Sequence, residues 1–400
     1  MKKLIFLLAI TFSVHSFAQK FEGLALTPPM GWNSWNTFGT DINEELVKDI
    51  ADKFIELGLK DAGYEYIVLD DGWMSKKRDV NGNLIADPSK FPNGMKALAD
   101  YIHSKGLKFG LYNCAGSKTC AGYPGSRGYE YQDAKLYASW GIDYLKYDWC
   151  NTEKLNAEGA YTTMRDALKA AGRPIVFSIC EWGDNEPWKW AKDVGHLWRV
   201  TGDIINCWDC EVGHGSWSSW GVWKIINMRK NIRNVAGPGH WNDFDMMEVG
   251  NGMTNAEDRT HFAMWSMLAS PLIMGNDLRN ATSETIKTLT NKEVISVNQD
   301  VLGIQGFRFS NEFNVEIWIK PLSNNKWAFT FVNMNDKPIS FEFDWQKHDI
   351  GDDVNQKFLE IKKTIYNIRD LFNHKNLGNT SSPLKTNIDT HDVLMIILSK

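Results

Sequence analysis

The sequence predicts a (β/α)8 TIM barrel over residues 24–303, followed by a C-terminal antiparallel β-sandwich domain over residues 304–400. Three observations predict this fold. Short apolar runs alternate with longer amphipathic stretches from residue 25 to about 300, which is typical of a parallel sheet with crossover helices. Polar residues directly follow the apolar runs, and the pattern past Gly303 changes to short alternating strands with Asn, Asp and Gly between them.

The individual barrel elements follow from hydrophobic periodicity. Apolar residues recur at helical spacing from Leu46 to Leu57. Further helices are predicted at 95–104, 131–140 and 157–171. Apolar runs predict strands at 66–69, 108–112, 144–147 and 175–179. The strands alternate with the helices, so the sheet is expected to be parallel.

The C-terminal domain is predicted from alternating segments. They lie at 315–319, 326–333, 339–343, 363–368 and 393–398. Because the linker at 303–306 is short, the two domains are expected to pack closely against each other.

The N-terminus predicts export. Lys2 and Lys3 precede an apolar run at 4–14 and a small-residue site that ends at Ala18, which is typical of a cleavable signal peptide over residues 1–18. The alternative, a membrane anchor, is disfavoured because a spanning helix needs ~20 apolar residues. The protein is therefore expected to be secreted or periplasmic.

Composition excludes several classes of partner and cofactor. The net charge of −5 comes without a basic run or an acidic tail, so neither nucleic acid nor a membrane surface is an expected partner. No glycine-rich nucleotide fingerprint follows the first strand. The six cysteines lack paired zinc-site spacing, and Cys207 and Cys210 could bond each other or stay reduced.

The segment 143–150 carries the clearest chemical signal. On a strand, Tyr144, Lys146 and Asp148 share one face by period-2 alternation. A cation beside Asp148 lowers the pKa of its carboxyl and keeps it ionised, as a nucleophile requires. One alternative is a purely structural pair of Lys146 and Asp148. Another is a barrel enzyme that uses Lys146 as a Schiff base, and the adjoining Asp148 carboxylate argues against it.

Glycoside hydrolysis needs a second carboxylate in a different environment. Asp203 follows a strand-like run, and Gly202 permits a tight turn before it. Asp70 and Asp71 follow another run and are suited to hold sugar hydroxyls by charge-assisted hydrogen bonds. A metal is the rival use of such carboxylates, but no histidine cluster or calcium-loop pattern accompanies them.

A series of motifs resembles a known family. They are Met30-Gly-Trp-Asn-Ser-Trp35, Leu69-Asp-Asp-Gly-Trp73, Lys118-Thr-Cys-Ala-Gly-Tyr123, Leu145-Lys-Tyr-Asp-Trp-Cys150, Cys180-Glu-Trp182, Gly237-Pro-Gly-His-Trp-Asn-Asp243 and Val297-Asn-Gln-Asp300. In this order, they are similar to glycoside hydrolase family 27, the α-galactosidases. The match covers residues 24–306.

The resemblance implies a retaining two-step hydrolysis of terminal α-D-galactosyl residues, without metal or cofactor. It places Asp148 as the nucleophile and Asp203 as the acid/base, with the two carboxyl groups about 5 to 5.5 Å apart. It pairs Cys120 with Cys150 and leaves Cys180 without its usual partner. The implied substrate is a galactose-containing oligosaccharide, polysaccharide or glycoconjugate. The implied sugar-pocket residues are Trp35, Asp70, Asp71, Tyr112, Lys146, Glu181, Trp182, Arg199, Asp245 and Met246.

Two positions bear on which sugar is accepted. Glu181 would accept a hydrogen bond from a 2-hydroxyl and fill the space of an acetamido group, which disfavours an α-N-acetylgalactosaminidase. Cys114 stands where the family usually has Asp, near the C5 substituent of the sugar. This change keeps open a β-L-arabinopyranosidase or a dual specificity. A noncatalytic sugar-binding protein is disfavoured because both Asp148 and Asp203 are present.

Overall fold

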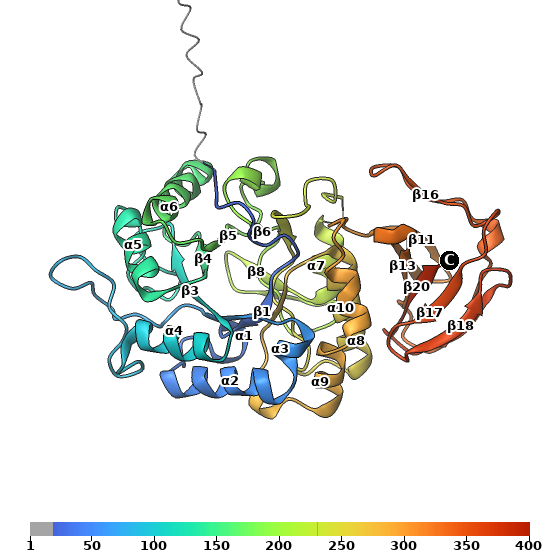
Figure 1. Cartoon of the computed structure of the whole chain (residues 1–400), viewed down its shortest axis with the longest axis horizontal. Helices are drawn as coiled ribbons and strands as arrows, with labels where there is room; N and C mark the ends of the chain where they lie inside the picture. The colour runs from blue at the N-terminus through green and yellow to red at the C-terminus, as the bar shows by residue number, and fades with distance from the viewer. Residues whose placement is uncertain (1–18, 230) are drawn as a thin grey trace, which may run out of the picture.

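The computed structural model describes residues 19–229 and 231–400. The predicted signal peptide at 1–18 lies outside the described residues. Figure 1 shows a barrel that carries the N-terminal three quarters of the chain and a β-domain beside it, drawn in red. Among the described residues, no helix combines the length and the apolar character that crossing a membrane requires.

Eight parallel strands form the barrel, in the order β10-β1-β2-β3-β4-β5-β6-β9. A bridge between Met247, just after β9, and Met274 on β10 closes the barrel. Met247 N donates to Ile273 O at 2.7 Å to support this closure. The strands are β1 Met30–Asn33, β2 Tyr66–Leu69, β3 Lys108–Cys114, β4 Tyr144–Asp148, β5 Val176–Cys180, β6 Leu197–Arg199, β9 Trp241–Asp243 and β10 Leu272–Met274. The four predicted barrel strands are thereby confirmed.

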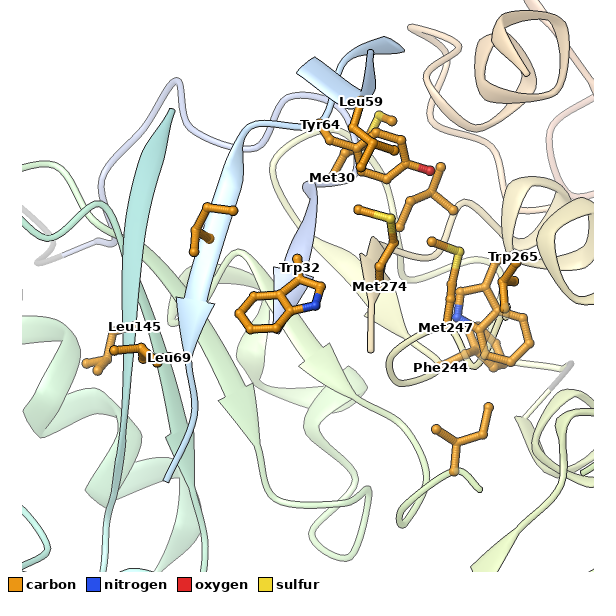
Figure 2. Close-up of a cluster of buried hydrophobic side chains, with 14 of the residues drawn as sticks. Met30, Trp32, Leu59, Tyr64, Leu69, Leu145, Phe244, Met247, Trp265 and Met274 are labelled. Atoms are coloured by element: carbon orange, nitrogen blue, oxygen red, sulfur yellow. The ribbon is translucent and has the colours of Figure 1, made fainter. Parts of the chain in front are cut away.

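Helices surround the sheet, and their apolar faces supply the core. The predicted helix from Leu46 is α2, in which the Asn43 side chain caps the first turn by accepting from Leu46 N. The other helices are α1 Trp35–Phe38, α3 Leu59–Ala62, α4 Gly94–Ser104, α5 Glu130–Trp140, α6 Ala157–Ala171, α7 Val222–Arg229, α8 Asn255–Leu268, α9 Ser283–Leu289 and α10 Lys292–Asn298, with α2 at Glu44–Glu56. Short 3-10 turns occupy Pro187–Lys189, Ala191–Asp193, Leu278–Asn280, Ser323–Asn325 and Trp345–Lys347. Figure 2 shows part of the buried cluster, including Trp32 on β1 and Met274 on β10.

The C-terminal domain packs a six-stranded antiparallel sheet against smaller two-stranded sheets. The large sheet has the order β11-β12-β13-β20-β17-β18. Phe331 of this sheet contacts Phe341 and Phe343 of β14 in a shared core. The strands are β11 Phe307–Glu312, β12 Val315–Pro321, β13 Trp327–Asn333, β14 Ile339–Phe343, β15 Ile350–Asp352, β16 Lys357–Leu359, β17 Asn367–Asp370, β18 Lys375–Asn379, β19 Leu384–Ile388 and β20 Val393–Ser399.

One predicted strand of this domain is misplaced. The expected strand at 363–368 instead begins at Asn367 and runs to Asp370. Lys363 and Thr364 belong to a turn, in which both backbone N–H groups donate to Glu360 O. Because Lys363 and Thr364 form a turn, they do not pair with the sheet. The alternating pattern in this segment therefore did not indicate a strand.

The barrel and the β-domain are in close contact, as the short linker predicted. Helix α8 contacts β12, β13 and β20. Arg259 on α8 forms an ion pair with Asp392 before β20, at 2.6 Å. Lys320 on β12 is buried and donates to Ser266 O and Val297 O at 3.0 and 2.7 Å.

Candidate active site

A cavity of about 1070 Å³ opens at the carboxyl ends of the barrel strands. Parallel strands bring their carboxyl ends to the same edge, so residues far apart in sequence meet there. The predicted site residues that line this cavity are Trp35, Asp70, Asp71, Tyr112, Lys146, Asp148, Trp182, Arg199, Asp203, Asp245 and Met246.

Asp148 ends β4 and is almost completely buried. Tyr112 donates its hydroxyl to Asp148 Oδ2 at 2.9 Å. The backbone N–H of Trp149 donates to Asp148 Oδ1 at 2.8 Å. Both carboxylate oxygens are therefore held in a defined orientation.

Lys146 affects Asp148 less than the sequence suggested. Its ammonium pairs with Asp70 Oδ2 at 2.7 Å, and Asp70 also accepts from Asn33 Nδ2 at 2.8 Å. Burial raises the pKa of Asp148 to about 6, although the charge of Lys146 acts to lower it. The prediction that Lys146 lowers this pKa is right for the contribution of the lysine itself. It is wrong for the net shift, because burial outweighs the charge of Lys146.

Asp203 lies in a more open environment than Asp148. The Asp203 side chain is 45% exposed, whereas Asp148 is almost completely buried. Arg199 Nη2 lies 3.0 Å from Asp203 Oδ1 and 2.6 Å from Asp245 Oδ2. Asp245 also accepts from the backbone N–H of Ile204 at 2.9 Å, and this contact ties down the segment that carries Asp203. The site therefore holds two carboxylates whose surroundings differ.

Asp71 has a buried carboxylate oxygen without a hydrogen-bond partner among the described residues. Its Oδ2 accepts from Ala121 N at 2.8 Å, whereas its buried Oδ1 has no hydrogen-bond partner among the described residues. Burial raises the pKa of this carboxyl. A buried acceptor without a partner is costly unless a ligand hydroxyl donates to it.

Both cysteine pairs near the site are bonded. The implied Cys120–Cys150 disulfide is present, and Cys207 and Cys210, whose state the sequence left open, also form a disulfide. Bonded sulfurs cannot serve as thiolate metal ligands. Cys180 is a free, buried thiol that lines the cavity.

Glu181 is not among the residues that line the cavity. It is fully buried, and its carboxylate accepts from Gly183 N, Asn185 N and Asn185 Nδ2 at 3.0, 2.6 and 2.8 Å. Burial raises its pKa to about 7. Trp182 has a φ of 61°, so the chain reverses there and folds the 183–185 segment onto the Glu181 carboxylate.

Cys114 is likewise absent from the residues that line the cavity. It is fully buried in β3, in register with Asp148. Its thiol donates to Cys150 O at 3.0 Å, in the loop that follows β4. The predicted contact of residue 114 with the sugar is therefore not supported by its position.

Sequence reasoning missed several lining residues. Glu248 is buried and accepts from Asn36 Nδ2 at 2.5 Å and from Asn251 Nδ2. Its place shortly after Asp245, beyond a strand, was an available signal. A second missed group comprises Ile204–Asn206, His214 and 216–220, from the segment between β6 and α7. No local pattern indicates that this segment folds back over the cavity.

Fold and site together define a barrel glycoside hydrolase. A buried carboxylate and a more exposed one meet at the strand ends, in a cavity that also presents aromatic rings and free acceptors. Two carboxylates in different environments are what hydrolysis of a glycosidic bond needs.

Comparison with known proteins identifies the family. Residues 27–300 match the model described as Alpha galactosidase A, and residues 312–398 match the Alpha galactosidase C-terminal beta sandwich domain. Alpha-galactosidase A of Cellvibrio japonicus is 55% identical, covering 98% of this chain and 96% of that protein. The chain belongs to glycoside hydrolase family 27, the α-galactosidases.

Solved structures agree with this assignment. The crystal structure of alpha-galactosidase I from Mortierella vinacea superposes with a TM-score of 0.88 at 36% identity, covering 94% of this chain and 98% of that one. A family 27 β-L-arabinopyranosidase from Geobacillus stearothermophilus has a TM-score of 0.79 at 24% identity, covering 94% of this chain and 97% of that one. The second likeness is one of fold alone.

Proposed function

We propose that this protein removes terminal α-D-galactosyl residues from galactosides by double displacement, with retention of configuration. The observation that carries the proposal is the buried, oriented Asp148 carboxylate beside a half-exposed Asp203 that Arg199 holds. Family membership at up to 55% identity supports the same activity.

In the first step, an oxygen of Asp148 attacks the anomeric carbon and forms a glycosyl-enzyme ester. The bond from that carbon to the leaving oxygen breaks as protonated Asp203 donates its proton to this oxygen. Tyr112 and Trp149 N hold the attacking carboxylate in place, so little reorganisation is needed.

In the second step, Asp203 acts as a base. It takes a proton from a water whose oxygen attacks the anomeric carbon, and the ester bond to Asp148 breaks. The exposure of Asp203 suits this exchange, since water reaches its carboxylate directly.

Galactose binding depends on the acidic end of β2. Asp70, charge-paired with Lys146, and the free Oδ1 of Asp71 present acceptors to the 4- and 6-hydroxyls. Trp35, Trp182 and Met246 supply the apolar surface for the ring. Trp182, rather than Glu181, is the bulky cavity residue of the 180–182 segment.

The alternative of a β-L-arabinopyranosidase rests on the replacement of the family's Asp by Cys114. The comparisons favour the galactosidase, because the alpha-galactosidases of Cellvibrio japonicus and Mortierella vinacea are 55% and 36% identical, whereas the β-L-arabinopyranosidase is 24% identical. We therefore expect galactosides to be preferred over arabinopyranosides.

The test compares kcat/KM for aryl α-D-galactopyranoside and aryl β-L-arabinopyranoside, with Asp148→Asn as the blank. We expect a galactoside preference of at least tenfold, about 1.4 kcal/mol. We expect Asp148→Asn to lose essentially all activity on both. Proton NMR of the first product should show the α-anomer of galactose. Activity that survives in Asp148→Asn, or a first product in the β form, would overturn the assignment.

We further propose that the protein is exported and acts on galactose-containing oligosaccharides, polysaccharides or glycoconjugates outside the cytoplasm. The two disulfides support an oxidising compartment. N-terminal sequencing of the exported protein, expected to begin at Gln19, checks this proposal.

A further inference from the structure

A two-stranded hairpin stands at one side of the cavity mouth. Its strands are β7, Glu211–Gly213, and β8, Ser218–Trp220, and we call residues 211–220 the rim hairpin. The Cys207–Cys210 disulfide lies directly before it. His214 and residues 216–220 line the cavity, although this segment is absent from the barrel sheet.

A backbone hydrogen bond joins the rim hairpin directly to Asp203, the proposed acid/base residue. Trp220 N donates to Asp203 O at 3.0 Å, and Ile205 N donates to Trp220 O at 3.0 Å. The Trp220 ring lies against Gly202, where an added Cβ would meet ring atom Cζ3 at 2.2 Å. The hairpin therefore occupies the Asp203 side of the cavity.

Trp217, at the turn end of the hairpin, carries a large aromatic ring that is exposed. It lines the cavity and yet is 53% exposed. His214 stacks on it with ring centroids 4.1 Å apart, and His214 Nε2 lies 2.8 Å from Ser219 Oγ. These contacts hold the indole in place while leaving much of it open.

The cavity is larger than one galactose requires. Its volume of about 1070 Å³ lies just above the range of about 300–1,000 Å³ that holds drug-sized ligands. The acid/base residue protonates the leaving oxygen, so the group behind that oxygen departs on the Asp203 side. The rim hairpin lies on that side.

We propose that the rim hairpin forms the subsite for the sugar that carries the galactosyl group, with the pyranose ring stacked on Trp217. This proposal rests on the proposed galactosidase function. A pyranose has an apolar C–H face that packs on an indole, while His214 and Ser216 offer polar groups to its hydroxyls. The preferred substrate class is then an oligosaccharide or polysaccharide with at least one pyranose behind the galactose.

The test uses two substrates that differ in the leaving group. Raffinose places a glucose ring behind galactose, whereas α-D-galactosyl fluoride leaves a single atom. We expect Trp217→Ala to lower the ratio of kcat/KM for raffinose to kcat/KM for the fluoride by about 10- to 100-fold. Trp217→Phe, which keeps a ring, should restore most of the ratio. Phe313→Ala removes an exposed ring in the β-domain and should leave the ratio unchanged.

Two outcomes would overturn the subsite. One is an unchanged ratio in Trp217→Ala, whether neither substrate or both substrates equally lose kcat/KM. The other is a Trp217→Phe variant as impaired as the alanine variant. Failure of the galactosidase function is distinguishable, because the wild-type protein would then not hydrolyse the fluoride either.

Discussion

At the scale of single residues, opposing effects set the state of Asp148. Burial raises the pKa of its carboxyl, Lys146 lowers it, the negative charge of Asp203 raises it, and the hydrogen bond from Tyr112 lowers it. The result is a pKa of about 6 in the free protein. A nucleophile must be ionised, so this value limits activity at acidic pH.

We expect kcat/KM for an aryl α-D-galactopyranoside to fall as the pH drops through about 6, because protonation removes the Asp148 nucleophile. Tyr112→Phe removes a hydrogen bond that favours the charged form, which raises the pKa of Asp148 and moves this acid limb to higher pH. The pH profile of kcat/KM for both proteins checks this. An acid limb near the ordinary carboxyl pKa, or a shift to lower pH in the variant, would contradict it.

At the scale of elements, the segment from β6 to α7 needs a small residue beside Asp203. Gly202 was expected to permit a tight turn, but it is not among the positive-φ glycines of the described chain. What it provides is space for the Trp220 ring. This contact links the rim hairpin to the segment that carries Asp203, the proposed acid/base residue.

Gly202→Ala should therefore destabilise the protein by ~1–3 kcal/mol, since the new methyl group meets an indole ring. It should also lower kcat/KM, because relieving the clash displaces Asp203 or the hairpin. Chemical denaturation and steady-state kinetics measure both effects.

Gly213→Ala is the matched control in the same hairpin. An added Cβ there meets nothing within 4 Å. The free energy of unfolding of Gly213→Ala should stay within about 0.5 kcal/mol of the wild-type value. If the two variants behave alike, the Gly202–Trp220 contact is not what makes position 202 sensitive.

At the scale of the whole molecule, a buried lysine joins the two domains. Lys320 of the β-domain donates to carbonyls of Ser266 and Val297 in the barrel. Burial lowers the pKa of this amine from its ordinary 10.5 to about 7. Between these two pH values the unfolded chain holds a proton that the folded protein lacks, so this group makes stability rise with pH.

Lys320→Met keeps an unbranched side chain of nearly the same length and removes the amine. We expect the Tm of wild type minus the Tm of this variant to increase from pH 7 to pH 10, because only wild type gains stability as the unfolded amine loses its proton. Lys326→Met, at an exposed lysine of the same domain, should show a nearly constant difference. A constant difference for Lys320→Met would mean that the amine is charged in the folded protein.

Much of the fold was predictable because its signals are local. Barrel strands appear as short continuous apolar runs because both of their faces are buried, and helices repeat apolar residues at a period of 3.6 because one face packs on the sheet. The strand β18 was missed because its sequence, Lys375–Asn379, is mostly polar and exposed. The pairing with β17 makes it a strand, and pairing is not a local property.

By itself, the sequence determined the barrel, the β-domain and the family, and it predicted Asp148 and Asp203 as the reacting carboxylates. Strand ends converge in any such barrel, so a residue at a strand end is placed by local pattern alone. Only the tertiary structure decided which side chains reach the cavity. Glu181 turns to bind the 183–185 segment, Cys114 bonds to Cys150 O, and the rim hairpin joins the site. These outcomes depend on backbone reversals and on contacts between distant segments. Local hydrophobic patterns in the sequence do not indicate such contacts.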